Sequence, residues 1–212
     1  MTPVDIERYS FEYDGKILGP VTYGQDFLPE LRRIVLAYTP TTPKLLEWGA
    51  GVSTLLLSEF AASSAGSLVS IEHNATYANS VLSRVRHPAT LRLFAEGLEG
   101  PRFCQDDVGL NYSTLPLSLG TSFDFVMIDG RRRLECAYSA FVLSTEHTVV
   151  VLHDYRRTRY QSVKVLFDVI EDGAQFRVMR PKPTLLSATN NERARLIAEH
   201  TGTSSSTFPS RH

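Results

Sequence analysis

The chain has 212 residues, of which 42% are hydrophobic and 21% are charged, and its formal net charge is −1. This composition is typical of one soluble α/β domain with appendages, and the near-neutral charge disfavours nucleic acid and anionic membranes as partners. The chain has no apolar run of about 20 residues, and it starts without the basic and apolar regions of a signal peptide, so we expect a cytoplasmic protein.

Short β-rich runs alternate with longer helical patterns from residue 44 to about residue 183, which predicts an α/β fold with a mostly parallel sheet covered by helices on both faces. An extra helix is predicted over 26–36. The predicted strands span 44–48, 67–72, 90–95, 123–129, 147–153 and 175–180. The predicted helices span 53–63, 75–86, 132–144 and 160–171, with Asn74 as a cap of the second. Residues 97–121 have no clear period and predict a loop-rich crossover or a short helix.

Three segments follow from this pattern. We expect an N-terminal extension at 1–43, the main domain at 44–190, and a partly disordered tail at 191–212 that begins with a short helix at 191–199. The extension is rich in aromatic residues, which would form either a lid over a ligand or an ordinary β-hairpin packed on the core. These residues are Tyr9, Phe11, Tyr13, Tyr23 and Phe27.

The run from Leu45 to Thr54 reads LLEWGAGVST and predicts a strand-to-helix turn that holds a ligand. Gly49 and Gly51 allow backbone angles and close approaches that a Cβ would prevent, and Ser53 or Thr54 can cap the following helix. A dinucleotide-binding turn would read G-x-G-x-x-G, but Thr54 stands in place of the third glycine. The Glu47 carboxylate also disfavours a pyrophosphate, so a ligand with a cationic end is expected.

Acids end most of the predicted strands, and in an open α/β sheet ligands bind beyond these carboxyl ends. A buried carboxylate is costly unless it is paired, so packing alone explains such a row poorly. We therefore expect one shared cleft. The residues at the strand ends are Glu47, Glu72, Glu96, Asp129, and the pair His153 and Asp154.

The E-W-G-A-G sequence of this turn resembles the first motif, E/D-x-G-x-G, of class I S-adenosylmethionine-dependent methyltransferases. The resemblance implies a Rossmann-like fold, S-adenosylmethionine as cofactor, and transfer of its methyl group. It makes Glu72 the acceptor of both ribose hydroxyls, and it places the adenine contact after the third strand, near Glu96, Asp106 and Asp107. The cofactor-binding residues it implies are Glu47, Trp48, Gly49, Gly51, Ser53, Thr54, Glu72, His73 and Asp129.

In the catechol O-methyltransferase group, acids at the ends of the fourth and fifth strands hold a divalent cation. The matching residues here are Asp129, His153 and Asp154. Three interpretations stay open for them: a divalent metal site, with manganese, cobalt or magnesium as candidates; a metal-free site in which His153 or Asp129 is a general base; or a structural pair. The only two cysteines, Cys104 and Cys136, lack metal-site spacing and predict free thiols.

The blocks from about 44 to 170, including V-x-L-H-D-Y, are similar to plant glucuronoxylan 4-O-methyltransferases and to bacterial methyltransferase-like proteins of unassigned function. This likeness implies an O-methyltransferase whose small-molecule acceptor carries a sugar or uronic acid hydroxyl. Arginines after two strands would suit an anionic acceptor, or they would simply be exposed at helix starts. They are Arg131, Arg132, Arg133, Arg156, Arg157 and Arg159, of which Arg131 and Arg157, together with Tyr155, are the substrate-binding candidates.

Other functions stay open on the same fold, because function depends on the site. They are a lyase, cyclase or hydrolase that binds S-adenosylmethionine, and a non-catalytic binding protein. A nicotinamide-dependent dehydrogenase is disfavoured by the missing third glycine, and the sequence leaves open whether the chain forms a homo-oligomer.

Overall fold

The computed structural model describes residues 7–19, 22, 24, 26–96, 110–188, 192 and 195. Its centre is a seven-stranded sheet with the spatial order β5-β4-β3-β6-β7-β9-β8. The strands are β3 (Lys44–Trp48), β4 (Ser67–Glu72), β5 (Leu91–Ala95), β6 (Phe125–Ile128), β7 (Val149–His153), β8 (Phe167–Asp172) and β9 (Phe176–Pro181). Strands β3 to β7 are parallel, whereas β9 runs antiparallel to both β7 and β8.

The strand order reverses between β3 and β6. From β3 the chain builds outward through β4 to β5 and then returns to β6 on the other side of β3. In open α/β sheets such a reversal opens a crevice beyond the carboxyl ends of the strands. The fold therefore predicts a ligand site at the ends of β3, β4, β6 and β7.

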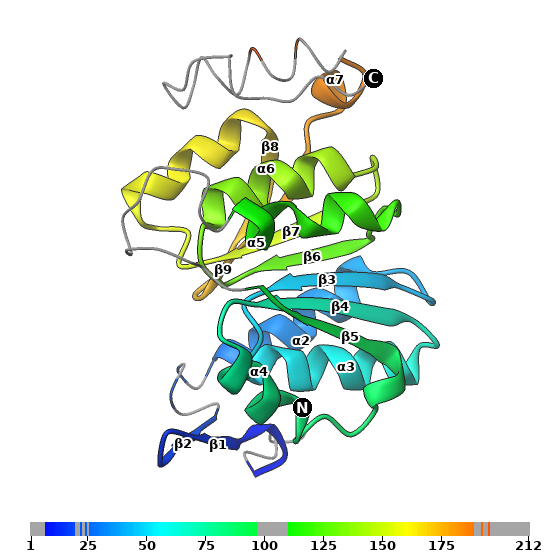
Figure 1. Ribbon diagram of the computed structural model, residues 1–212. Helices are drawn as coiled ribbons and strands as arrows, with labels where there is room; N and C mark the ends of the chain where they lie inside the picture. Colours follow the sequence, from blue (N-terminus) through cyan, green and yellow to red (C-terminus); the bar gives the residue numbers. More distant parts are fainter. Residues whose placement is uncertain are drawn as a thin grey trace.

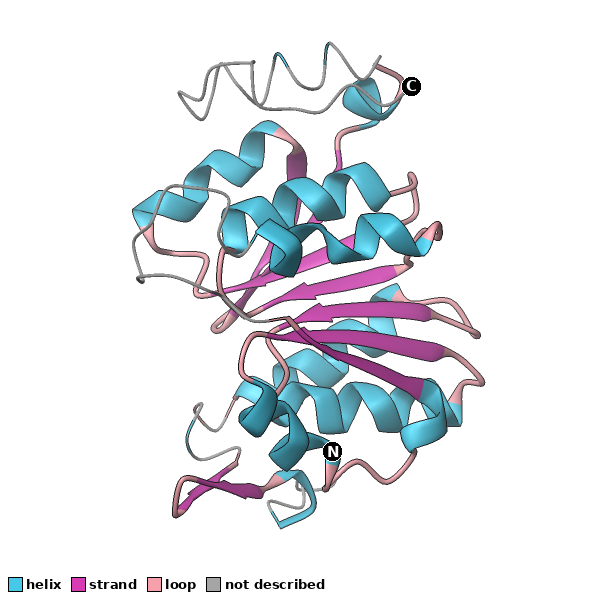
Figure 2. Cartoon of the chain, viewed as in Figure 1, coloured by secondary structure: helices cyan, strands magenta, loops and turns pink. Residues whose placement is uncertain are grey.

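Helices cover both faces of the sheet (Figures 1 and 2). One face packs on α2 (Phe27–Tyr38), α3 (Val52–Ser63) and α4 (Ala75–Leu82). The other packs on α5 (Leu110–Thr114), α6 (Arg133–Leu143) and the 3-10 helix η4 (Thr158–Val165). The remaining elements are η1 (Glu7–Tyr9), η2 (Pro88–Thr90), η3 (Leu115–Leu119), α7 (Pro183–Leu186), and the hairpin strands β1 (Phe11–Tyr13) and β2 (Lys16–Leu18).

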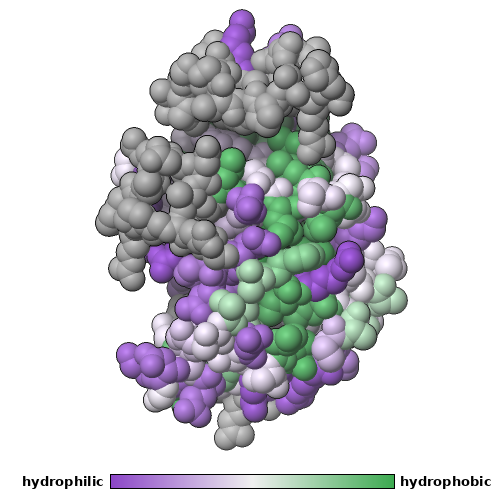
Figure 3. All heavy atoms as spheres, viewed as in Figure 1, coloured by the Kyte–Doolittle hydropathy of each residue, from purple (hydrophilic) through white to green (hydrophobic). Residues whose placement is uncertain are grey.

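Two apolar cores form because alternate residues of each strand face opposite layers. In β3, Leu45 joins the core under α2 and α3, whereas Leu46 joins the core under α6. Central strands buried on both faces are apolar along their whole length, as in the run Phe125–Ile128. On the face of the molecule seen in Figure 3, apolar residues gather in a band right of the centre, with polar residues beside it.

The predicted α/β fold is confirmed. Each of the six predicted strands is found within two residues of its expected ends, and the helices at 26–36, 53–63 and 132–144 are found with similar accuracy. The helix predicted over 75–86 ends earlier, at Leu82, because the chain turns there toward η2, which starts at Pro88. Asn74 caps this helix as expected, since its Oδ1 accepts the Tyr77 amide at 3.0 Å.

The helix predicted over 160–171 is found only in its first part, as a 3-10 helix, and is wrong beyond Val165. The chain instead forms η4 up to Val165 and then the edge strand β8. Tyr160, Val163 and Phe167 have the spacing of an apolar helix face, but Phe167 is already paired with Pro181 of β9. Antiparallel pairing with β9, including a bulge between Val169 and Glu171, prevailed over the local pattern.

The N-terminal aromatics are divided between two roles. Residues 11–18 form the hairpin of β1 and β2, and Phe11 and Phe27 are buried in the core. Tyr13 instead reaches the cleft described below. Tyr23, Cys104, Asp106, Asp107 and most of the predicted tail at 191–212 lie outside the described residues, whereas Cys136 is a buried free thiol. No helix of the described part is long and apolar enough to cross a membrane.

Candidate functional site

A cleft of about 450 Å³ lies where the strand order reverses. It is bounded by the ends of β3, β4, β6 and β7 and by the β1–β2 hairpin. Seven residues predicted from the sequence line this cleft: Gly49, Glu72, His73, Asp129, Arg131, His153 and Asp154. The expected convergence of strand-end residues on one cleft is therefore found for most of them, although Glu96 is not among the lining residues.

The β3–α3 turn packs directly against the β6–α6 turn. Gly49 has a φ of 93°, and a Cβ on it would lie 2.5 Å from Gly130 backbone atoms. A Cβ on Gly130 would in turn collide with the hydroxyl of the buried Tyr112. Both glycines are therefore required for the two turns to meet at the floor of the cleft.

The start of α3 differs from the prediction. Gly51 is the N-cap residue, so neither Ser53 nor Thr54 occupies that position. Thr54 acts from the third helical position instead, because its Oγ1 accepts the Gly51 amide at 2.8 Å. This bond satisfies an amide that the helix itself leaves without a partner.

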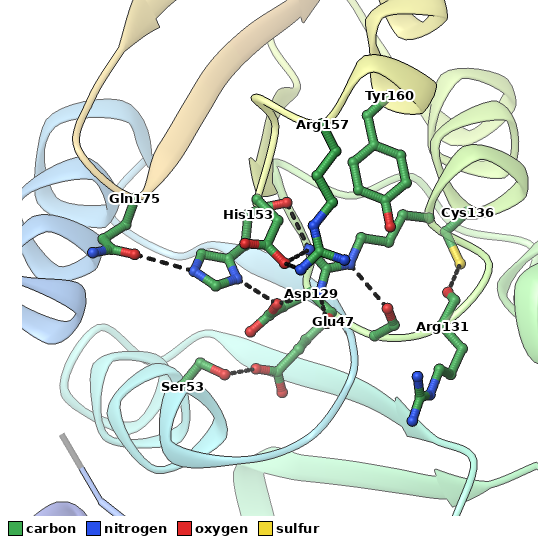
Figure 4. Close-up of polar contacts among 12 residues, drawn as sticks. Glu47, Ser53, Asp129, Arg131, Cys136, His153, Arg157, Tyr160 and Gln175 are labelled. Atoms are coloured by element: carbon green, nitrogen blue, oxygen red, sulfur yellow. Dashed lines mark hydrogen bonds and ion pairs between the residues drawn. The ribbon is translucent and has the colours of Figure 1, made fainter. Parts of the chain in front are cut away.

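Glu47 is fully buried and does not line the cleft. Its carboxylate accepts hydrogen bonds from Ser53 Oγ at 2.5 Å, Thr54 Oγ1 at 2.6 Å and Ser70 Oγ at 2.7 Å. Burial raises the pKa of Glu47 to about 7, even though these three bonds act to lower it. Glu47, Ser53 and Thr54 thus hold the turn from inside, and none of the three lines the cleft. Figure 4 shows the bond between Ser53 and Glu47.

Trp48 and Gly51 also stay outside the lining of the cleft. Trp48 is completely buried, and its Nε1 donates to the Tyr112 carbonyl at 2.9 Å. This bond ties β3 to α5. Trp48 therefore supports the β3–α3 turn from within the core.

Glu72 presents one carboxylate oxygen to the cleft. Its Oε1 accepts the Asn74 amide at 3.0 Å and lies 2.6 Å from His73 Nδ1. No hydrogen bond to Oε2 is recorded from the described residues. Asn74 Nδ2 donates to the Tyr13 hydroxyl at 3.1 Å, and the Tyr13 ring packs edge-on against Tyr77 at 4.9 Å. The hairpin therefore forms an aromatic wall beside Glu72.

Across the cleft, Asp129 and His153 form a hydrogen-bonded pair. His153 Nδ1 lies 2.7 Å from Asp129 Oδ1, and its Nε2 lies 3.3 Å from Gln175 Oε1 (Figure 4). Phe27 and Phe176 pack against the imidazole at 5.2 and 5.3 Å between ring centres. Burial lowers the pKa of His153, but the hydrogen bond and charge of Asp129 and the charge of Asp154 outweigh it, so the pKa lies above its ordinary value.

The three residues considered for a metal do not form a metal site. Among the residues that the structure describes, no group of three or more His, Cys, Asp or Glu side chains could hold a metal ion. The Arg133 guanidinium contacts Asp129 Oδ1 at 2.9 Å and Asp154 Oδ2 at 3.3 Å. A fixed positive charge therefore already lies between the two carboxylates, and the metal interpretation is not supported.

The predicted substrate residues lie in different environments. Arg131 lines the cleft, and Figure 4 shows its guanidinium turned away from the Asp129 cluster. Arg157 pairs with Asp154 at 2.6 Å and does not line the cleft. Tyr155 is buried, and its hydroxyl donates to the Gly173 carbonyl at 2.9 Å, so it is a structural residue of the loop after β7.

Sequence reasoning missed several residues of the site. Ala50, Asn74, Tyr77 and Gly130 line the cleft, and Gln175 contacts His153. Ala50 and Gly130 are neighbours of predicted residues in strand-end turns, a position that could have identified them. Tyr77 and Gln175 reach the site from a helix and from the β8–β9 turn, and no local pattern marks them.

Comparison with solved structures places this architecture among the methyltransferases. A methyltransferase-like protein from Silicibacter pomeroyi is 19% identical over 81% of this chain and 93% of its own, with a TM-score of 0.58. The chain has the class I methyltransferase fold. The MycE methyltransferase of the mycinamycin pathway, solved with Mg and S-adenosylhomocysteine, has a TM-score of 0.52 at 12% identity over 83% of this chain and 53% of its own.

The N-methyltransferase NodS from Bradyrhizobium japonicum has a TM-score of 0.50 at 11% identity, covering 76% of this chain and 97% of its own. No family model and no curated protein matched the sequence. At these identities the likeness shows the fold alone, and the acceptor must be argued from the cleft itself.

Proposed function

We propose that this protein is an S-adenosylmethionine-dependent methyltransferase that methylates a hydroxyl oxygen of a small, anionic or sugar-like acceptor. The observation that carries the proposal is the pairing, in one cleft, of an open carboxylate oxygen on Glu72 with a hydrogen-bonded Asp129–His153 pair. The first is suited to a ribose and the second to deprotonating an acceptor.

Glu72 and the β3–α3 turn fit the cofactor. The Asn74 amide holds Oε1 of Glu72, which leaves Oε2 to accept hydrogen bonds from ribose hydroxyls. Gly49 lets the β3–α3 turn pack closely against Gly130, which forms the floor of the cleft. Tyr13 and Tyr77 offer an aromatic wall beside it. Bound S-adenosylmethionine would supply a methyl group already activated by its sulfonium.

His153 is the proposed general base. Because the Asp129 carboxylate accepts from Nδ1, a neutral ring carries its proton there. Its Nε2 would then accept the proton of an acceptor hydroxyl that takes the place of the 3.3 Å contact with Gln175 Oε1. The packed rings of Phe27 and Phe176 and the bond to Asp129 hold the imidazole in one orientation. The remaining rate enhancement would come from alignment of the acceptor with the methyl group.

Arg131 supports an anionic acceptor. It lines the cleft, and the structure records no ion pair between its guanidinium and the described residues. A guanidinium binds carboxylates through two parallel hydrogen bonds, which suits a uronic acid or a similar small anion. Arg157 contributes less directly in this proposal, because it neutralises Asp154.

Calorimetric titration with S-adenosylmethionine and S-adenosylhomocysteine tests the cofactor assignment. We expect Glu72→Ala to weaken binding about 100-fold, because hydrogen bonds to a charged group contribute about 1.5 to 3 kcal/mol each. Glu146→Ala is the matched control, since Glu146 is 75% exposed and follows α6 at the opposite end of the sheet.

Absence of binding by the wild-type protein, or equal binding by both variants, would contradict the proposal. Analysis of products over a panel of sugar acids then separates methyl transfer from a lyase, cyclase or hydrolase reaction. Only methyl transfer yields S-adenosylhomocysteine together with a methylated acceptor.

A further inference from the structure

Arg133, the first residue of α6, has the most extensively bonded guanidinium bordering the cleft in the described part of the chain. Its Nε donates to the Gly130 carbonyl at 3.0 Å and its Nη1 to the His153 carbonyl at 2.7 Å. Its Nη2 donates to the carbonyl and to Oδ1 of Asp129, at 2.8 and 2.9 Å. With the Asp154 pair at 3.3 Å, the donors of the guanidinium face acceptors from the ends of both β6 and β7.

The backbone on both sides of these contacts is held in the left-handed region. Arg132 has a φ of 47° and Asp154 a φ of 58°, which is uncommon for residues other than glycine. Such conformations persist where the surrounding contacts determine them, and they cluster at functional sites. The one at Arg132 starts α6 beside Arg133, and the one at Asp154 lies in the residue whose carboxylate meets the guanidinium.

We propose that the Arg133 guanidinium occupies the place of a divalent cation between the ends of β6 and β7, so that this protein organises Asp129, His153 and Asp154 without a metal. The proposal concerns the ion-binding property of the cleft, and its consequence for methyl transfer rests on the proposed function. Arg133 is a positioning residue here, because it acts through Asp129 and the backbone of His153.

The burial of this cluster supports the proposal that the Arg133 guanidinium takes the place of a divalent cation. The side chains of Arg133, Asp129 and His153 are 11%, 14% and 14% exposed, so the Asp129 carboxylate depends on its partners for compensation. Asp129 Oδ1 already faces two donors, Arg133 Nη2 and His153 Nδ1. A metal ion at this oxygen would have to displace both the guanidinium and the imidazole.

Binding of Mn²⁺, followed by the loss of its free-ion electron paramagnetic resonance signal, tests the proposal without any activity assay. We expect the full-length wild-type protein to leave the signal unchanged. Arg133→Met removes the charge and nearly preserves the length of the side chain, and we expect it to bind Mn²⁺ at least ten-fold more tightly than wild type. Adding Asp129→Asn to this variant should abolish the gain, and Arg86→Met, at a side chain 55% exposed beside Glu59, should show none.

Thermal unfolding accompanies these titrations. Removing one partner of a buried ion pair predicts a fall in Tm on the order of 10 °C for Arg133→Met. Arg133→Lys keeps the charge with fewer donors, so it should lose less stability and still exclude Mn²⁺. If Arg133→Met does not fold, titration of the wild-type protein and of Arg133→Lys with Mn²⁺ still tests the proposal, because binding of Mn²⁺ by either would contradict it.

Binding of Mn²⁺ by the wild-type protein that disappears in Asp129→Asn would overturn the proposal. A folded Arg133→Met that gains no Mn²⁺ affinity would also overturn it. These results are distinct from a failure of the proposed function, which calorimetry with S-adenosylmethionine would report independently of any metal.

Discussion

Glu47 and Asp129 give the same signal in the sequence, an acid at the end of an apolar strand, but they lie in opposite environments. Glu47 is fully buried, and its recorded partners are three hydroxyls. Asp129 is 14% exposed and faces Arg133 and His153. Burial raises the pKa of Glu47 to about 7, whereas the Asp129 carboxylate is paired with the Arg133 guanidinium and the His153 ring.

The position relative to the strand end explains the difference. Glu47 is still inside β3 and is followed by the paired Trp48, whereas Asp129 is the first residue after β6. A side chain inside a central strand faces one of the two covering layers, and a residue just beyond the strand can face the cleft. One acid therefore stabilises the turn from inside, and the other lines the cleft.

The largest expected effect is on Asp129. Asp129→Asn removes the charge that orients His153 and pairs with Arg133, so we predict a loss of methyl-transfer rate of about 1,000-fold. Cofactor affinity measured by calorimetry should change far less. Asp124→Asn is the control, because Asp124 precedes the same strand at its other end, where its Oδ2 accepts the Lys44 amide.

The pH dependence of the residual rate sharpens this test. Although burial lowers the pKa of His153, the hydrogen bond and charge of Asp129 keep it above its ordinary value in the wild-type protein. The acid limb of the rate profile should therefore move to lower pH in Asp129→Asn. An unchanged limb would mean that His153 is not the base that the rate reports.

The second prediction concerns Glu47 and stability. A folded-state pKa of about 7, above the unfolded value, means that the folded protein binds this proton more tightly. Its contribution to the free energy of unfolding is therefore complete below the unfolded pKa and is lost as pH rises through about 7. The loss is on the order of 3 kcal/mol at about 1.4 kcal/mol per pKa unit.

Glu47→Gln removes the titrating group and keeps its shape. The difference in unfolding free energy between wild type and Glu47→Gln, measured in urea across this pH window, should fall as pH rises. Glu146→Gln, an exposed position, should give a difference that stays constant. A constant difference for Glu47→Gln as well would show that Glu47 does not titrate in this pH window.

Much of this arrangement follows from the sequence, because the central strands are continuous apolar runs and the glycines mark the turns. The glycines of E-W-G-A-G correctly predicted a tight turn after β3, and the acids at 72, 129 and 154 were correctly expected to line one cleft. The direction in which Glu47 points could not be predicted, since it depends on where the strand ends. The role of Arg133 depends on contacts with two strand ends that are distant in sequence.

The smallest expected effect is that of Ser70→Ala, which changes the surroundings of Glu47 alone. Ser70 Oγ donates to Glu47 from the neighbouring strand β4, so Ser70→Ala removes one of three hydroxyl donors while barely changing the packing volume. We predict a loss of about 1 to 2 kcal/mol of unfolding free energy. Because this hydrogen bond lowers the pKa of Glu47, its removal should also move the stability window to higher pH.

Ser63→Ala is the matched control, since the Ser63 hydroxyl is exposed and its recorded bond among the described residues is to the Phe60 carbonyl of its own helix. The free energies of unfolding of Ser70→Ala and Ser63→Ala are measured in urea across the same pH range and compared. If Ser70→Ala lowers stability but leaves the pH window where it was, burial alone would account for the raised pKa of Glu47. If the window moves, the hydroxyls beneath the turn partly offset the free-energy cost of burying the Glu47 carboxylate. At the cleft, Arg133 and His153 offset this cost for Asp129.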